Sequence, residues 1–284
     1  MKKGGKLVYG VGIYGQGGMG TEYANGDMAQ AGVGRAIFPL ACRVNERFDV
    51  GGSVDIVWAG MDLAVTAYNI DFRDGSDFTG AAKGYGVAAK LGFTCTLSDA
   101  LTVGGAYQTA GNLPDLKGDG YKVVGFDMPA TFGLGLAWQA SNRPMVAADI
   151  KDILWGSSMN TVAIQMPGGG TAPFQQDWED QIVVLLGLAY RFSDAFTGRV
   201  GYNHGKNPIP DQFVSYLWPA IVEDHYTVGF GYAFGKQAQI NFGLSYVPEV
   251  TVTATNPMPP PNGNGGMAIE HSQVNWQLMY SYMF

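Results

Sequence analysis

Residues 274–284, Val-Asn-Trp-Gln-Leu-Met-Tyr-Ser-Tyr-Met-Phe, decide the fold class of this chain. Every second side chain in the stretch is large and apolar or aromatic, namely Val274, Trp276, Leu278, Tyr280, Tyr282 and Phe284. A period of two predicts a β-strand with one apolar face. Tyr and Trp at the edges of an apolar band are typical of barrel strands that cross lipid headgroups, whereas a soluble sandwich strand could show the alternation alone. The stretch therefore favours a transmembrane barrel.

The composition supports this interpretation. The chain has 284 residues, with Gly 42, Tyr 15, Phe 15 and Trp 6 but only 14% charged residues. It contains no apolar run of about 18 residues, the length that a spanning helix needs. A formal net charge of −7 argues against a nucleic-acid partner, which would require a basic face.

The same alternation recurs along the chain and predicts about twelve strands, with Phe132, Leu186 and Phe230 among the outward residues. The charged residues test this register, because a charge facing lipid costs about 2–4 kcal/mol at the midplane. Most of them fall on the opposite, inward parity: Arg43, Asp49, Asp55, Lys90, Asp127, Asp149, Lys151, Arg191 and Arg199. Asp152 and Asp224 face outward, near strand ends. We therefore predict an all-β fold, an antiparallel transmembrane β-barrel that forms a single domain over residues 1–284.

The predicted connections alternate between tight turns and long loops. The turns lie at residues 45–47, 98–100, 141–144, 193–195 and 235–237, and the loops at 15–34, 59–85, 110–120, 156–180, 204–223 and 247–271. Short turns at one end and long loops at the other are the organisation of an outer-membrane barrel.

Signals for chemistry are thin. His204, His225 and His271 show no triad order and no metal spacing, so we expect no enzyme activity, no catalytic residue, no metal and no cofactor. Cys42 and Cys95 lie on strands separated by a third, which predicts two free thiols. The glycine runs 15–18 and 168–170 precede no helix signal and are interpreted as loop glycines.

Two predicted loops are too apolar to face only water. They are residues 61–72, with Tyr68 and Phe72, and residues 213–222, with Phe213, Leu217 and Trp218. They could fold over the barrel mouth and bury one another, or present a capture surface for a hydrophobic ligand, and one surface could do both. We take these five aromatic and aliphatic residues as candidate substrate contacts.

Four basic residues, Arg43, Lys90, Lys151 and Arg199, point inward by parity. Each could pair with an inward carboxylate such as Asp55, Asp127 or Asp149, or meet a ligand carboxylate. We select Arg199 as a candidate substrate contact because its strand leads into the apolar loop and a guanidinium binds a carboxylate through two hydrogen bonds. Lys151 is a further candidate.

Several stretches, taken in order, resemble the FadL/TodX family of outer-membrane transporters for long-chain fatty acids and aromatic hydrocarbons. They are residues 10–23, 127–138, 147–155, 201–211 and 225–232. The resemblance implies fourteen strands, an N-terminal hatch, and passage of the ligand through a gap in the wall. This chain starts where the third strand of the family would be, so we expect neither hatch nor signal peptide in it. The gap-forming strand would correspond to residues 6–14, with Gly10 and Gly12 at the lateral opening.

We therefore expect passive transport of long-chain fatty acids or aromatic hydrocarbons across the outer membrane of a Gram-negative bacterium. The expected partners are the hydrophobic ligand and the surrounding lipid and lipopolysaccharide, with the barrel a monomer. A general porin for polar solutes and a structural or adhesive barrel are the alternatives.

Overall fold

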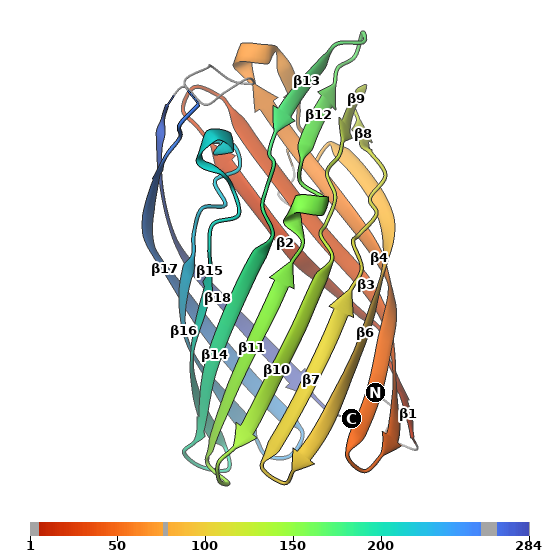
Figure 1. Ribbon diagram of the computed structural model, residues 1–284, viewed down its shortest axis with the longest axis vertical. Helices are drawn as coiled ribbons and strands as arrows, with labels where there is room; N and C mark the ends of the chain where they lie inside the picture. Colours follow the sequence, from red (N-terminus) through yellow and green to blue (C-terminus); the bar gives the residue numbers. More distant parts are fainter. Residues whose placement is uncertain (1–5, 76–78, 257–265, 284) are drawn as a thin grey trace.

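A computed structural model describes residues 6–75, 79–256 and 266–283 of the chain (Figure 1). These residues form an 18-stranded antiparallel sheet with three short 3-10 turns. The strands are β1 Leu7–Tyr9, β2 Gly12–Glu22, β3 Met28–Asn45, β4 Phe48–Val65, β5 Ile70–Phe72, β6 Ala82–Ser98, β7 Leu101–Gln108, β8 Leu116–Gly118, β9 Tyr121–Val124, β10 Thr131–Gln139, β11 Pro144–Ile153, β12 Thr161–Gln165, β13 Thr171–Gln175, β14 Gln181–Arg191, β15 Phe196–Gly205, β16 Asp224–Phe234, β17 Ala238–Thr253 and β18 Ala268–Tyr282. The 3-10 turns are η1 Thr66–Tyr68, η2 Trp155–Ser157 and η3 Asp211–Phe213.

The wall of the barrel is a succession of long strands, each hydrogen-bonded to the next. It runs β2, β3, β4, β6, β7, β10, β11, β14, β15, β16, β17 and β18. β1 extends β2 along the same partner, β3. The prediction of an antiparallel barrel of about twelve strands is therefore confirmed. No helix among the described residues is long and apolar enough to cross a membrane.

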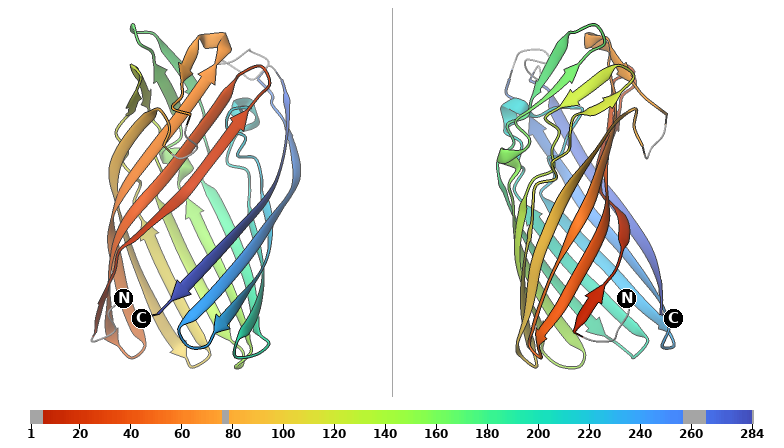
Figure 2. Two further views of the ribbon diagram at one scale, coloured as in Figure 1. Left: turned by 180° about the vertical axis from the view of Figure 1, so that it is seen from behind. Right: turned by 90° about the vertical axis from the view of Figure 1, so that its right-hand side faces the viewer.

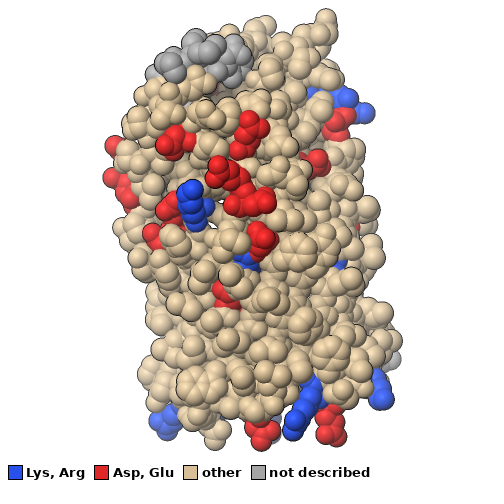
Figure 3. Space-filling model, in the orientation of Figure 1, with Lys and Arg blue, Asp and Glu red and all other residues tan. Residues whose placement is uncertain are grey.

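The outer face of the wall is apolar, as the alternation predicts. Phe132, Leu186 and Phe230 are 49%, 51% and 37% exposed, and the register places them on the face opposite to Lys151 and Arg199, which line the inner cavities. Figure 3 shows the charged residues of one face spread over its upper half and along its lower edge, with a band between them that carries almost no charge. Such a band is what the hydrocarbon core of a bilayer requires.

The two ends of the barrel differ. Tight turns join the wall strands at one end, at residues 46–47, 99–100, 140–143, 192–195 and 235–237, and both chain termini lie near it (Figure 1). The opposite end, here called the loop end, carries the longer connections together with β5, β8, β9, β12 and β13. The predicted tight turns are confirmed.

Several of the predicted long loops contain strands: β12 and β13 lie within 156–180, and 247–271 includes the end of β17 and the start of β18. Two predicted loops, at 15–34 and 59–85, are wrong over much of their length. Residues 15–34 are mostly strand, in β2 and β3, and only Tyr23–Asp27 connect them, so the glycine run at 15–18 lies in a strand and not in a loop. Small residues hid the alternation there. Gly34 is one example: a Cβ on it would lie 2.2 Å from the ring of Trp58, so the glycine allows this cross-strand aromatic ring to lie flat on it.

The predicted loop at 59–85 is also wrong at its start, because β4 continues to Val65, and Ile70–Phe72 form β5. Residues 59–65 are buried on both faces, on one side by residues around Thr79 and Gly80. A strand covered on both faces has a continuous apolar sequence without alternation, and so loses the pattern that reveals a strand.

The core of the molecule lies at the loop end. Buried residues from β4, β5, β8, β9, β12 and the long connections form one apolar cluster, here called the loop-end cluster. Cys42 and Cys95 are free thiols on β3 and β6, with β4 between them, as predicted.

Candidate functional site

The connection between β15 and β16 contains the apolar segment Phe213–Val222, here called the cap segment. Val214, Leu217 and Ile221 are almost completely buried in the loop-end cluster, and Phe213 and Trp218 pack against that cluster while partly exposed. The cap segment therefore helps to close the lumen at the loop end with apolar side chains.

Hydrogen bonds tie the cap segment to the first and last strands of the wall. The Thr21 hydroxyl on β2 donates to the Leu217 carbonyl at 3.0 Å, and the Tyr23 hydroxyl donates to the Tyr216 carbonyl at 2.7 Å. On β18, Nδ1 of His271 lies 2.8 Å from the Pro219 carbonyl oxygen. The cap segment thus bridges β2 and β18 at the loop end.

Asp27, at the tip between β2 and β3, fixes this bridge. Its carboxylate accepts hydrogen bonds from the Tyr216 hydroxyl at 3.0 Å, the Thr66 amide at 2.8 Å and the Asn25 side-chain amide at 3.0 Å. Burial acts to raise the pKa of Asp27, but these hydrogen bonds outweigh burial and hold the pKa below its ordinary value. Burial and the bond to Asp27 raise the pKa of Tyr216, so the phenol remains a donor.

The other predicted aromatic contacts lie within the loop-end cluster. Phe72 is 1% exposed and packs on Tyr121 with ring centroids 4.9 Å apart. Tyr68 is partly exposed and meets Phe174 edge-on at 6.3 Å. Phe72 is accordingly a packing residue in this state, whereas Tyr68 and the cap segment keep some surface free.

Below the cap segment, β2 contains a β-bulge. The register passes from Gly15–Gly34 to Gly17–Val33, which leaves Gln16 as an extra residue. The Gln16 side chain accepts a hydrogen bond from Nε of Arg35. Bulges re-aim a side chain and bend their strand, and this one turns Gln16 into the barrel.

Arg35 is the centre of a buried polar group. Its Nη1 lies 2.8 Å from Oδ2 of Asp55, and both side chains are 0% exposed. The Ser53 hydroxyl donates to the other oxygen of Asp55 at 2.5 Å. Nη2 of Arg35 is buried without a hydrogen-bond partner among the described residues. The bulge therefore depends on a costly buried ion pair.

The first and last wall strands each keep one edge without a ladder partner. Within the described residues, β1 and β2 form a residue ladder with β3 alone, and β18 forms one with β17 alone. β18 is exposed on both faces over 274–282. The two edges flank the same side of the barrel, here called the seam (Figure 2, left).

The predicted opening residues lie at the start of this edge. Gly10 and Val11 interrupt the strand between β1 and β2, and the Gly10 amide donates to the Pro39 carbonyl at 3.1 Å. Pro39 has no N–H to return a bond, which explains why the ladder breaks there. Gly12 begins β2, with Ile37 only 3.1 Å from the position of a Cβ.

A cavity of about 450 Å³, here called the seam cavity, lies beneath the cap segment. It reaches from Gly18–Gly20 on β2 to His271 and Gln273 on β18. Its remaining lining consists of Lys151, Ile153, Trp155, Trp178, Gln181, Val183, Asn203, Gly205, Pro208, Pro219, Ala220, Val222, Glu223 and His225. Trp155 and Trp178 meet edge to face, with centroids 4.9 Å apart, and supply an aromatic wall.

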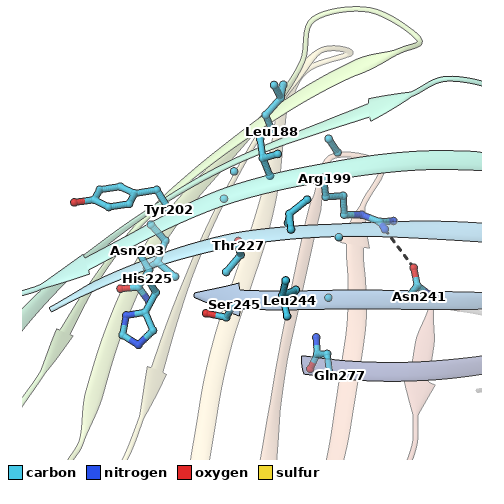
Figure 4. Close-up of a pocket in the computed structure, with 18 of the residues that line it drawn as sticks. Leu188, Arg199, Tyr202, Asn203, His225, Thr227, Asn241, Leu244, Ser245 and Gln277 are labelled. Carbon is cyan, nitrogen blue, oxygen red and sulfur yellow. Dashed lines mark hydrogen bonds between the residues drawn. The ribbon is translucent and has the colours of Figure 1, made fainter. Parts of the chain in front are cut away.

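A second cavity of about 850 Å³, here called the lower-lumen cavity, continues towards the tight-turn end (Figure 4). Its inward side chains are mostly polar, among them Asn203, His225, Thr227, Asn241, Ser245 and Gln277. Arg199 donates from Nη1 to Oδ1 of Asn241 at 3.3 Å. Two tryptophans thus line the lumen beneath the cap segment, whereas the lower-lumen cavity combines these polar side chains with apolar ones such as Leu185 and Met279.

The comparisons with known proteins agree with this architecture. A family model described as outer membrane protein transport protein (OMPP1/FadL/TodX) matches residues 1–282. The chain belongs to this family. It is accordingly a β-barrel of the Gram-negative outer membrane that crosses the bilayer several times. A comparison with curated proteins finds no match.

Solved structures of the family are similar over almost the whole chain. The toluene transporter TodX of Pseudomonas putida is 26% identical, with a TM-score of 0.76, over 98% of this chain and 80% of that one. The toluene transporter TbuX of Ralstonia pickettii is 22% identical, with a TM-score of 0.75, over 99% and 79%. A FadL homologue of Pseudomonas aeruginosa is 18% identical, with a TM-score of 0.75, over 98% and 75%.

The structure brings only part of the predicted set together. Lys151 lines the seam cavity, close to the cap segment, whereas Arg199 lines the lower-lumen cavity and does not meet the cap segment. Sequence reasoning missed Trp155 and Trp178, which lie in the connections that flank β12 and β13. Their aromatic character was the available signal.

Proposed function

We propose that this outer-membrane barrel carries hydrophobic small molecules inward by diffusion, and that monoaromatic hydrocarbons fit it better than long-chain fatty acids. The similarity to TodX, a toluene transporter, supports this ligand class. So does the size of the seam cavity, about 450 Å³, because that volume suits one or two aromatic rings better than an extended acyl chain. No chemistry and no cofactor take part.

The observation that carries the proposal is the position of the seam cavity. It touches the aromatic wall, the cap segment and the free edge of β2, while the lumen below it has a mixed lining that includes the charged side chains of Asp149 and Arg199. An apolar ligand that passes these charged and amide groups loses about 25 cal/mol for each Å² of its apolar surface that returns to water. Leaving sideways into lipid keeps that surface out of water, so we infer a lateral exit beside β2.

The orientation follows from the class of barrel. Short turns of bacterial outer-membrane barrels face the periplasm and longer loops face the outside. The loop end with the cap segment is then the entrance, and Gly10 and Gly12 lie at the periplasmic end of the lateral exit.

The candidate contacts take separate roles in this proposal. Tyr68, Phe213 and Trp218, which keep exposed surface, receive the ligand at the entrance, while Phe72 and Leu217 support them from the loop-end cluster. Lys151 meets any polar group of a ligand in the seam cavity. We further propose that the barrel acts as a monomer surrounded by outer-leaflet lipopolysaccharide and lipid.

The alternatives fit less well. A general porin needs a continuous water-filled path, and here the buried loop-end cluster covers the outer end of the lumen. A purely structural or adhesive barrel gives no role to a cavity with two edge-to-face tryptophans.

Uptake of labelled toluene tests the proposal. Cells without another hydrocarbon channel should take up toluene faster when they express this protein than when they carry the empty vector. Proteoliposomes containing it should not swell in small saccharides. Saccharide permeation without faster toluene uptake would favour the porin.

A further inference from the structure

The tight-turn end of the lumen holds three arginines that the hydrocarbon path does not use. Arg143, Arg191 and Arg199 line one cavity of about 350 Å³, together with Gln139, Met145 and Thr197. They come from adjacent strands: the Arg191 amide donates to the Arg143 carbonyl at 3.0 Å, and Arg199 pairs in register with Ala189, two residues before Arg191.

Within the described residues, no carboxylate neutralises these three positive charges. Among the described residues, none of these arginines forms an ion pair, and Arg199 has only the neutral Asn241 as a side-chain partner. Asp149 and Arg199 both line the lower-lumen cavity, but they do not form an ion pair. By contrast, Arg35 and Arg43 of the same barrel each have a carboxylate partner.

Such an arrangement does not stabilise the barrel, because like charges on neighbouring strands repel one another. Gly231 nevertheless makes room for it: a Cβ there would lie 2.9 Å from Nη1 of Arg199 and 2.7 Å from Oδ1 of Asn241. The guanidinium therefore lies close against the wall, and its other N–H groups have no hydrogen-bond partner in the part of the chain that the structure describes.

We propose that this cluster is a binding site for small carboxylates that enter the lumen from the periplasmic side. A guanidinium binds a carboxylate through two parallel hydrogen bonds, and three of them around one cavity attract an anion even though the protein is negatively charged overall. Met145 and the Gln139 amide add one apolar and one polar side chain to the lining of the cavity. Such a lining suits a carboxylate attached to one aromatic ring. The site lies apart from the seam cavity and does not depend on the hydrocarbon path.

Benzoate is the probe, with toluene as its uncharged counterpart. Binding of each is measured by ligand-observed NMR and titration calorimetry on the purified barrel in detergent, in low and high salt. We expect benzoate to bind more weakly in high salt. Arg191→Gln should weaken the affinity for benzoate about tenfold, which is the loss expected when one charge-assisted hydrogen bond is removed. The affinity of Arg191→Lys for benzoate should lie between those of the unchanged protein and Arg191→Gln, because Lys keeps the positive charge but cannot form two parallel hydrogen bonds to a carboxylate.

The matched control is Arg47→Gln, which removes an arginine from another tight turn that does not line this cavity. It should bind benzoate as the unchanged protein does. Heat-modifiable migration in gels reports whether each variant is folded. The proposal is overturned if benzoate does not bind, or if folded Arg191→Gln and Arg47→Gln bind it equally well.

Discussion

Replacing Arg35 by Met should destabilise the barrel more than any single change on its outer face. Arg35 and Asp55 are both fully buried, 2.8 Å apart, and Arg35 also holds Gln16 at the β2 bulge. Removing one partner of a buried ion pair typically costs about 3–5 kcal/mol, because the other charge stays buried and uncompensated.

The double change Arg35→Met with Asp55→Leu removes both charges and should recover most of that loss. Replacing a buried pair by apolar side chains of similar volume is often neutral or stabilising. A residual deficit of about 1 kcal/mol should remain, since the hydrogen bonds to Gln16 and from Ser53 are also lost.

Reversible urea unfolding in lipid vesicles, followed by tryptophan fluorescence, measures both free energies of unfolding. The matched control is Arg43→Met, because Arg43 pairs with Asp49 at 3.2 Å while 69% exposed and should cost less than about 1 kcal/mol. The reasoning is refuted if Arg35→Met costs no more than Arg43→Met, or if the double variant is less stable than the single one.

Three further predictions test the cap, the orientation and the aromatic wall. Because hydrogen bonds depress the pKa of Asp27, its stabilising contribution should be complete above pH about 4 and lost only as pH falls through the folded pKa. The urea midpoint should therefore show no Asp27-dependent change between about pH 5 and pH 8. Asp27→Asn should lower the free energy of unfolding by about 1–2 kcal/mol at both of these pH values. In intact cells, an impermeant maleimide should label Lys117→Cys at the loop end and not Lys236→Cys in a tight turn, and the opposite result would reverse the orientation. Trp155→Leu should slow toluene uptake about threefold, because the ligand loses an aromatic contact. Trp138→Leu, on the lipid face, should leave the uptake rate unchanged. Equal effects of the two changes would show that toluene does not pass along the aromatic wall.

The register of the wall could be predicted because the bilayer imposes it. In strands such as Gln181–Arg191 every second residue is large and apolar or aromatic, since that face meets lipid while the other faces the lumen. The alternation disappears where lipid no longer acts, as in Met28–Gly34 with its small residues and in Met61–Val65, which is buried on both faces. Those segments were predicted as loops for that reason.

The candidate site was less accessible to sequence reasoning. The apolar segments were recognisable because buried loop residues are unusual, but their contacts with Thr21, Tyr23 and His271 join positions far apart in the chain. Parity placed Arg199 in the lumen correctly and could not give its height along the barrel axis. The bulge at Gln16 leaves no sequence pattern, because it is one extra residue in a strand of glycines.

The proposed lateral exit beside β2 is tested most directly by a matched pair of obstructions, Gly17→Trp and Gly187→Trp. Gly17 lies on β2 and Gly187 lines the lower-lumen cavity, and a Cβ at either position meets nothing within 4 Å, so both variants should fold. We predict that Gly17→Trp reduces the rate of labelled toluene uptake severalfold while Gly187→Trp leaves it unchanged. Reduced uptake in Gly187→Trp with normal uptake in Gly17→Trp would show that the ligand passes straight down the lumen and would contradict the account.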